Sequence, residues 1–351
     1  MRAIRPGIIL LLALAAACLS SRAGPAEAGG SDPVLVGAGD IAFCASSGDE
    51  ATASLLDGIA GTVATFGDNA YQSGTESEFA TCYDPIWGRH KARTRPAPGN
   101  HDYRTAGASG YFGYFGAAAG DPFKGYYSYD LGAWHILAIN SNCSQVGGCN
   151  AGSPQELWLR ADLAESPAPC TLAYWHHPRF SSSLHGSQAS MQAIWQALHD
   201  DGADVVLSGH DHAYERFALQ DPTGTPDPAG GIRQFVVGTG GKSHYAIATP
   251  IANSEVHDDD TFGVLKLTLH ATSYEWEFVP EAGGTFSDSG SASCVGLAVG
   301  GIAELPEAAR APLEAGASSG PGAALLVAAG VLAGVASIGG AAWYARRRWA
   351  S

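Results

Sequence analysis

Short apolar segments and amphipathic segments alternate along the first half of the chain. Apolar or alternating residues predict strands at 34–36, 62–66, 126–129, 134–139, 171–175, 204–207, 232–237, 261–269 and 273–279. Apolar residues spaced every three or four positions predict helices at 49–60, 154–164 and 188–199. Strands and helices that alternate early and then give way to consecutive strands predict an α/β sandwich of mixed sheets.

The amino-terminal end follows a different pattern. Arg2 and Arg5 precede a ten-residue apolar run at 8–17, and small residues at 26–28 offer a cleavage site. The run is too short to span a bilayer. We therefore predict a signal peptide over 1–28 and an exported chain.

The carboxyl-terminal end predicts a membrane anchor. Residues 323–344 contain no charged side chain, end in the aromatic pair 343–344, and are followed by the arginines 346–348. That length spans a bilayer, and aromatic and basic residues mark its cytoplasmic end. A buried Ala/Gly-rich helix and a removable lipid-anchor signal are the alternatives, but neither explains the arginines. We predict a transmembrane helix over 322–345 and a basic cytoplasmic tail over 346–351.

The rest of the chain divides into one globular domain and a linker. Residues 296–321 are rich in Gly, Ala, Pro and Ser and poor in large apolar residues, which is typical of a stalk. Residues 31–295 remain as a single domain, and we assign 283–294 to it although that stretch has few large apolar residues. The predicted location is the cell surface.

Composition narrows the class of protein. The hydrophobic content of 46% excludes a disordered chain. The chain has 19 basic and 34 acidic residues, a net charge of −15, and no cluster of Lys and Arg in the domain that would bind a phosphate backbone. We therefore expect no nucleic-acid partner, and we predict no protein partner.

Cysteine usage agrees with export. Six cysteines remain when Cys18 is assigned to the signal, and an even number in an exported chain predicts up to three disulfides without fixing their connectivity. Cys143 and Cys149 are near enough in sequence to close one loop, and Cys294 is placed to pin the carboxyl-terminal segment. A lipoprotein role for Cys18 is the less favoured alternative, because three alanines precede it.

A polar cluster follows each of five short apolar segments. The clusters are Gly39-Asp40, Gly67-Asp68-Asn69-Ala70-Tyr71, Gly99-Asn100-His101-Asp102, His176-His177-Pro178 and Gly209-His210-Asp211-His212. Each is weak alone, since Gly-Asp after a strand is commonly a turn. Ligand sites gather at the carboxyl ends of strands in α/β sheets, so we expect the five clusters to converge. Oxygen and imidazole ligands without thiolate suit Fe, Mn or Zn, and a shared carboxylate can hold two ions about 3.5–4 Å apart.

This ordered set of motifs resembles the calcineurin-like metallophosphoesterase superfamily over about 34–278. Many members carry Asp-x-His at the first motif, whereas this chain has Asp40-Ile41-Ala42. Tyr71, three residues after Asp68, takes the place of that histidine, and this Gly-Asp-x-x-Tyr form is similar to the purple acid phosphatase branch. The resemblance implies a four-layer αββα sandwich of two mixed sheets, an α+β fold to which the transmembrane helix is added.

The resemblance also implies two metal ions, Fe(III) in one position and Fe(II), Zn(II) or Mn(II) in the other. It places Asp40, Tyr71 and His212 on the first ion, Asn100, His176 and His210 on the second, and Asp68 on both. By the same resemblance, a metal-bound hydroxide would attack the phosphorus of a small phosphate ester.

The acid that protonates the leaving group has two candidates. His101 is the first, with Asp102 expected to hold its ring. His185 matches a substrate-contacting histidine of the purple acid phosphatases, although its Ser- and Gly-rich loop is equally compatible with a solvated side chain. We assign His177, which precedes Pro178, to shaping the loop.

The sequence therefore predicts an acid-phosphatase-like phosphomonoesterase, a metal-dependent hydrolase of phosphoric esters. A phosphodiesterase or nucleotidase that uses the same metal pair is the alternative enzyme. A surface binding protein that keeps the fold without turnover is less favoured, because every metal position holds a competent ligand.

Overall fold

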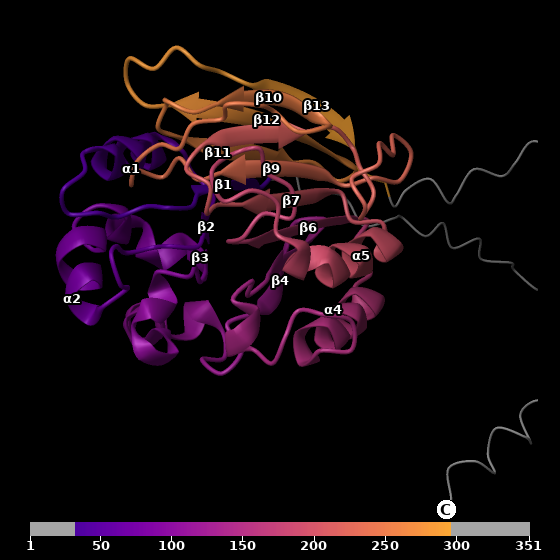
Figure 1. Ribbon diagram of the computed structural model, residues 1–351, viewed down its shortest axis with the longest axis horizontal. Coiled ribbons are helices and arrows are strands. Elements are labelled where there is room, and N and C mark those ends of the chain that lie inside the picture. Colours follow the sequence, from indigo (N-terminus) through magenta and orange to yellow (C-terminus); the bar gives the residue numbers. More distant parts are fainter. Residues whose placement is uncertain (1–31, 296–351) are drawn as a thin grey trace, which may run out of the picture. The chain divides into compact units, whose positions relative to one another are not determined.

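The computed structural model describes residues 32–295, which form two mixed β-sheets with helices on their outer faces (Figure 1). The six-stranded sheet has the order β13-β12-β11-β1-β2-β3. Its strands are β1 (Val34–Ala38), β2 (Thr62–Phe66), β3 (Thr94–Ala97), β11 (Gly263–Leu269), β12 (Ser273–Pro280) and β13 (Ser289–Ser293). The seven-stranded sheet has the order β10-β8-β9-β7-β6-β5-β4. Its strands are β4 (Tyr127–Leu131), β5 (Trp134–Ala138), β6 (Cys170–Trp175), β7 (Val205–Ser208), β8 (Tyr214–Phe217), β9 (Arg233–Val237) and β10 (Ser254–Asp258).

Five α-helices lie within the described residues. They are α1 (Gly48–Gly58), α2 (Glu76–Glu78), α3 (Ser109–Phe115), α4 (Pro154–Glu165) and α5 (Gln192–Asp201). Segments of 3-10 or π helix are η1 (Phe79–Tyr83), η2 (Trp87–Arg93), η3 (Asp102–Arg104), η4 (Ala106–Ala108), η5 (Gly116–Ala119), η6 (Cys143–Gln145) and η7 (Ala189–Met191). The predicted sandwich of two mixed sheets is confirmed.

The parallel strands aim their carboxyl ends at one edge of the sandwich. Strands β1, β2 and β3 run parallel in one sheet, and β5, β6, β7 and β9 run parallel in the other. At this edge the two sheets are joined by a hydrogen bond of 2.9 Å from Gly39 N to Val237 O. A Cβ atom on Gly39 would lie 3.1 Å from the Cα of Gly209, so only glycine lets the two backbones approach this closely.

Apolar residues from both sheets pack between them. A second core lies between helices α4 and α5 and the seven-stranded sheet. Leu159 of α4 and Ile194, Trp195 and Leu198 of α5 are buried in this second core against the seven-stranded sheet. The two helices lie side by side (Figure 1). Helix α4 begins where Ser153 accepts the backbone N–H of Glu156, as expected for a serine cap.

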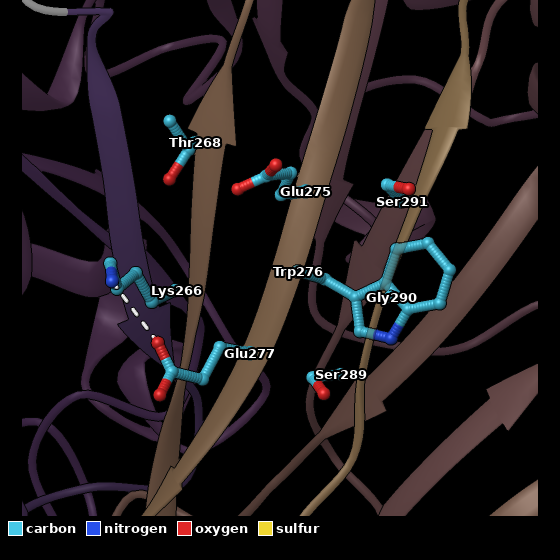
Figure 2. Close-up of a pocket in the computed structure, with 8 residues that line it drawn as sticks. All are labelled: Lys266, Thr268, Glu275, Trp276, Glu277, Ser289, Gly290 and Ser291. Atoms are coloured by element: carbon cyan, nitrogen blue, oxygen red, sulfur yellow. Dashed lines mark hydrogen bonds and ion pairs between the residues drawn. The ribbon is translucent and has the colours of Figure 1, made fainter.

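The outward face of β11, β12 and β13 is polar. Among the residues drawn in Figure 2, the polar side chains, including Lys266, Glu275 and Glu277, stand at alternate positions of their strands. Lys266 Nζ lies 3.1 Å from Glu277 Oε2, and both side chains are partly exposed. Alternation of this kind is typical of a sheet that faces a core on one side and solvent on the other.

Three disulfides settle the connectivity that the sequence left open. They join Cys44 to Cys82, Cys143 to Cys149, and Cys170 to Cys294. Cys294 therefore links the end of the described chain to the start of β6.

Several element predictions need correction. The strands β3, β8, β10 and β13 were not predicted; β13 has the sequence SGSAS, which lacks an apolar pattern, and it pairs with β12 along its whole length. The helix predicted over 188–199 begins later, at Gln192, because Ala189–Met191 forms a 3-10 turn.

The predictions for the two ends lie outside the described residues. These are the signal peptide (1–28), the stalk (296–321), the transmembrane helix (322–345) and the tail (346–351). Among residues 32–295, no helix is long and apolar enough to cross a membrane.

Candidate metal centre

Three predicted ligands sit at turns that only a strained backbone can make. Asp40, Asp68 and His210 have φ values of 61°, 52° and 71°, and each follows a glycine directly after a parallel strand. Positive φ is costly for residues other than glycine, and such strain clusters at functional sites. The turns aim these three side chains inward at the carboxyl edge of the sheets.

The first set of donor atoms surrounds the phenol of Tyr71. Its Oη lies 2.7 Å from Asp40 Oδ1, 3.0 Å from Asp68 Oδ2 and 3.3 Å from His212 Nε2. All four residues are buried. The structure therefore brings together the three predicted ligands of the first ion and the predicted bridging carboxylate.

The second set surrounds His176. Its Nε2 lies 3.1 Å from Asn100 Oδ1, 3.2 Å from Asp68 Oδ2 and 3.2 Å from His210 Nδ1. Asp68 Oδ2 thus faces both sets, while its Oδ1 accepts the backbone N–H of His101 at 2.7 Å. One carboxylate oxygen lies between the two groups of donors, as the predicted bridging role requires.

Neighbouring groups orient the imidazoles. His176 Nδ1 lies 2.9 Å from Phe66 O, and His212 Nδ1 lies 2.8 Å from Ser243 Oγ. A proton on Nδ1 that is donated to these acceptors leaves the Nε2 lone pair of each ring directed into the site, which is how metal-ligating histidines are commonly held.

The electrostatics of the cluster suit a cation. Burial, followed by the charges of Asp40 and Asp68, raises the pKa of Tyr71 well above its usual value. Burial also lowers the pKa of His210, so that this imidazole is neutral. Among the described residues, no Lys or Arg forms an ion pair with either carboxylate. Two carboxylates, a phenol and several imidazoles that face one another without a Lys or Arg are the kind of donor set that a metal ion takes, and the residues present fit the implied metal pair.

Three rings form an outer layer over the inner ligands. His101 lies over Tyr71 with ring centroids 4.4 Å apart, and His185 stacks on His210 at 4.3 Å. Tyr245 stacks on His212 at 4.0 Å. Both predicted acid candidates therefore reach the site, and His185 is placed in it, although its side chain also contacts solvent.

The role predicted for Asp102 is wrong. His101 Nδ1 lies 2.7 Å from Gln72 O, and no hydrogen bond joins the His101 ring to Asp102 among the described residues. Asp102 is fully buried and accepts hydrogen bonds from Gly99 N and Asn69 Nδ2, so it holds the loop beneath the ligands. Asp102 follows His101 directly in sequence, but its carboxylate is taken up by Gly99 and Asn69 instead of by the His101 ring.

Two residues of the site were not predicted as part of it. Tyr245 belongs to the loop after β9, where Gly238-Thr239-Gly240-Gly241 provides the same strand-end glycine signal as the other clusters. His177 was assigned only to loop shape, but its ring lies 4.4 Å from that of His210, and its Nδ1 is 2.8 Å from Ser141 Oγ. The nitrogens of His176, His177 and His210 lie close enough together to share an ion.

Two mixed sheets that hold carboxylates, imidazoles and a phenol at their carboxyl edge define the metallophosphoesterase class of fold. The chain belongs to the calcineurin-like phosphoesterase family, whose model matches residues 35–214.

Its curated relatives include purple acid phosphatases. Purple acid phosphatase 15 of Arabidopsis thaliana is 28% identical over 201 residues, which cover 48% of this chain and 37% of the relative. Purple acid phosphatase 22 of the same plant is 34% identical over 122 residues, covering 33% of this chain and 27% of the relative. The chain therefore spans well under half of the length of these relatives.

Solved structures share the fold. Purple acid phosphatase PPD1 from yellow lupin seeds superposes with a TM-score of 0.61 at 22% identity, covering 75% of this chain and 54% of that one. GAP50, described as the anchor in the inner membrane complex of Plasmodium, superposes with a TM-score of 0.58 at 13% identity, covering 76% of this chain and 90% of that one.

Proposed function

We propose that this chain is an extracytoplasmic, dinuclear-metal phosphatase that hydrolyses phosphomonoesters. The observation that carries the proposal is the position of Asp68, whose Oδ2 lies 3.0 Å from Tyr71 Oη and 3.2 Å from His176 Nε2. A single oxygen between two complete sets of donors is the arrangement by which a carboxylate bridges two ions. The family membership and the purple acid phosphatase relatives support the same class of reaction.

The chain's own residues would hold the two ions as follows. Asp40, Tyr71 and His212 would hold one; Asn100, His176 and His210 would hold the other; Asp68 would hold both. Anionic oxygen donors, above all a phenolate, favour a trivalent ion at the first position. When bound by these residues, the two metal ions would act as Lewis acids that neutralise the phosphoryl oxygens, and they would supply an activated water.

The outer rings would handle the proton and the ester oxygens. With its Nδ1–H donated to Gln72 O, His101 would have to be an imidazolium to hold a second proton on Nε2 for the leaving group, and burial lowers the pKa of this ring. His185, which stacks on His210, and Tyr245, which stacks on His212, would orient the phosphoryl group.

The first experiment compares a simple phosphomonoester with a matched diester, from acid to alkaline pH, with protein purified without chelator. We expect monoester turnover with an acidic optimum. A preference for the diester would replace the proposal with the phosphodiesterase alternative, and binding of a phosphate ester without turnover would favour a non-catalytic surface protein.

The first metal has its own test. Phenolate coordinated to Fe(III) absorbs visible light, so the active protein should be coloured, and Tyr71→Phe should bleach it. An active, colourless and iron-free protein would overturn the ferric assignment while leaving the hydrolase intact.

The proposed location follows from the sequence alone. We propose export by residues 1–28 and attachment to the cell surface by residues 322–345, with the enzyme facing outward. Fractionation of cells that express the full chain, with protease added outside, tests it: the domain should be in the membrane fraction and be cleaved only from outside.

A further inference from the structure

A buried carboxylate without a basic partner attaches the His185 loop to the metal site. Asp211 stands between the predicted ligands His210 and His212 and is fully buried. Its Oδ2 accepts the hydroxyl of Ser181 at 2.5 Å, and its Oδ1 accepts the backbone N–H of His185 at 2.8 Å. No Lys, Arg or His of the described residues forms an ion pair with it. All the hydrogen bonds that its carboxylate oxygens accept come from this loop.

A second buried carboxylate holds the same loop one residue further on. Glu215, at the start of β8, is 1% exposed and accepts the backbone N–H of Ser182 at 2.9 Å as well as the Ser182 hydroxyl. Ser182 Oγ in turn accepts the N–H of Ile251 at 2.9 Å. The segment from His210 to Glu215 is therefore hydrogen-bonded to the loop through two carboxylates, those of Asp211 and Glu215.

Among the described residues, the other hydrogen bonds of the loop lie within it or join it to the adjacent Gln188, apart from one of 3.3 Å that Ser183 Oγ donates to Tyr245 O. The residues from Ser181 to Ser187 are mainly serine and glycine, and Leu184 is 68% exposed, so apolar burial contributes little. Ordering each residue of a loop costs about 1–2 kcal/mol of backbone entropy, which these hydrogen bonds must offset. Hydrogen bonds to a charged acceptor are the stronger kind, and an ionised carboxylate accepts several donors at once.

The position of the His185 ring depends on this attachment. With its backbone N–H held by Asp211, the imidazole stacks on His210 at an interplanar angle of 25° and lies 5.4 Å from the ring of Tyr245. Asp211 and His210 are adjacent in sequence, so the residue that aims His185 is fixed to the residue on which His185 stacks.

We propose that Asp211 is a positioning residue, which acts through Ser181 and the His185 backbone to hold the His185 imidazole over the metal site, where it contacts the phosphoryl group or the leaving oxygen of the substrate. The proposal rests on the proposed function for its catalytic consequence, but the attachment itself is a property of the fold.

The kinetic test is a double-mutant cycle with Ser181→Ala and His185→Ala. We expect Ser181→Ala to lower kcat about tenfold, the scale on which a hydrogen bond to a charged group acts. Added to His185→Ala, it should lower kcat no further, because the ring that it positions is gone. Ser128→Ala is the matched control: it removes a similar bond, of 2.8 Å to Asp162, in another part of the domain. Unchanged kcat in Ser181→Ala, or a full tenfold loss added to that of His185→Ala, would overturn the proposal.

Amide hydrogen exchange tests the attachment without relying on turnover. In the full-length protein, we expect the hydrogen-bonded amides of Ser182, His185 and Gly186 to exchange slowly, and Ser181→Ala and Asp211→Asn to speed exchange at His185 at least about tenfold, while Ser128→Ala does not. Fast exchange in the wild type, or no change in either variant, would contradict the inference. If the wild type hydrolyses no phosphate ester, the proposed function fails, and the exchange result still decides whether Asp211 holds the loop.

Discussion

Two groups of buried donor atoms lie at opposite ends of strands β6 and β7. At the amino ends, Cys170, Asp204 and Cys294 bring a carboxylate and two sulfurs together, and at the carboxyl ends Asp40, Asp68 and His176 do the same with carboxylates and an imidazole. In both groups the atoms lie within 4.8 Å of one another. By distance alone, both are candidate metal sites.

The donor atoms of the group at the amino ends are all engaged in other bonds. Cys170 and Cys294 form a disulfide, which removes both thiolates. Asp204 accepts the backbone N–H of Thr171 at 2.8 Å and that of Val295 at 2.5 Å. The two cysteines of this group are bonded to each other, and Asp204 is hydrogen-bonded to the backbone. The group therefore fixes the end of the described chain to the domain.

The side chains of the group at the carboxyl ends contain no disulfide and keep the atoms that can bind a metal ion. Oxygens of Asp40, Asp68 and Tyr71 face one another, and nitrogens of His176 and His210 do the same. Positive φ angles at Asp40 and Asp68 hold the arrangement in place. The comparison teaches that carboxylate, phenol and imidazole groups that converge on a backbone with positive φ, rather than proximity alone, mark the candidate metal site.

The largest expected effect comes from removing the bridging carboxylate. Asp68→Asn should lower phosphoester hydrolysis at least about a thousandfold, well beyond the 10–100-fold typical of groups behind the ligands. It should also release metal. Asp204→Asn, the matched change at the other end, should keep both metal and turnover, so equal losses in the two variants would break the comparison.

The disulfide at the amino ends should matter for stability alone. Replacing Cys170 and Cys294 with serine frees a loop with a sequence separation of 124, and we expect the free energy of unfolding to fall by about 4 kcal/mol. Metal content per folded chain should not change. Chemical denaturation together with metal analysis checks both, and loss of metal from the folded variant would contradict the structural role.

Asp204 should make stability depend on pH. Burial, partly offset by the two backbone donors, raises its pKa to about 6. The folded state therefore binds this proton more tightly than the unfolded state, so stability from this group is fully present below about pH 4 and is lost as the pH rises through 6. The loss is at most about 3 kcal/mol, because each tenfold difference in proton affinity between the two states is worth about 1.4 kcal/mol.

Urea unfolding at several pH values measures this dependence. Asp204→Asn should flatten the decline between about pH 4 and 6 relative to the wild type, because no proton is then exchanged at that position. The same slope in both proteins would show that Asp204 does not titrate across that range.

The smallest effect is expected on the polar outer face of the six-stranded sheet (Figure 2). Glu277→Gln breaks the ion pair with Lys266, whose two side chains are 32% and 55% exposed, and should change the free energy of unfolding by less than about 0.5 kcal/mol. Thermal unfolding at low and high salt is a sufficient measurement. A change in the free energy of unfolding above about 1 kcal/mol would contradict the description of this contact as an ordinary solvent-exposed ion pair.

The convergence of the proposed ligands could be predicted from the sequence because each lies in a short motif directly after a short segment predicted as a strand end. Asp40, Asp68, Asn100, His176 and His210 all have this placement, and strand order then brings them to one edge. The mixed-sheet sandwich was predictable from the same alternation of strands and helices.

Contacts between distant segments could not be predicted in the same way. The attachment of Ser181 to Asp211 and the pairing of Cys44 with Cys82 depend on tertiary positions that no local pattern encodes. Asp102 shows the same limit for a predicted contact. A carboxylate next to His101 in sequence suited a hydrogen bond to that ring, but in the fold it is buried beside Asn69 and bonds to it instead.

Metal stoichiometry tests the central claim most directly. The full-length protein, purified without chelator, and its Asp68→Asn variant would be analysed for bound iron, zinc and manganese per folded chain. The account predicts close to two ions per chain in the wild type and no more than one in the variant. Less than one ion in the wild type, or equal occupancy in both proteins, would contradict a dinuclear centre bridged by Asp68.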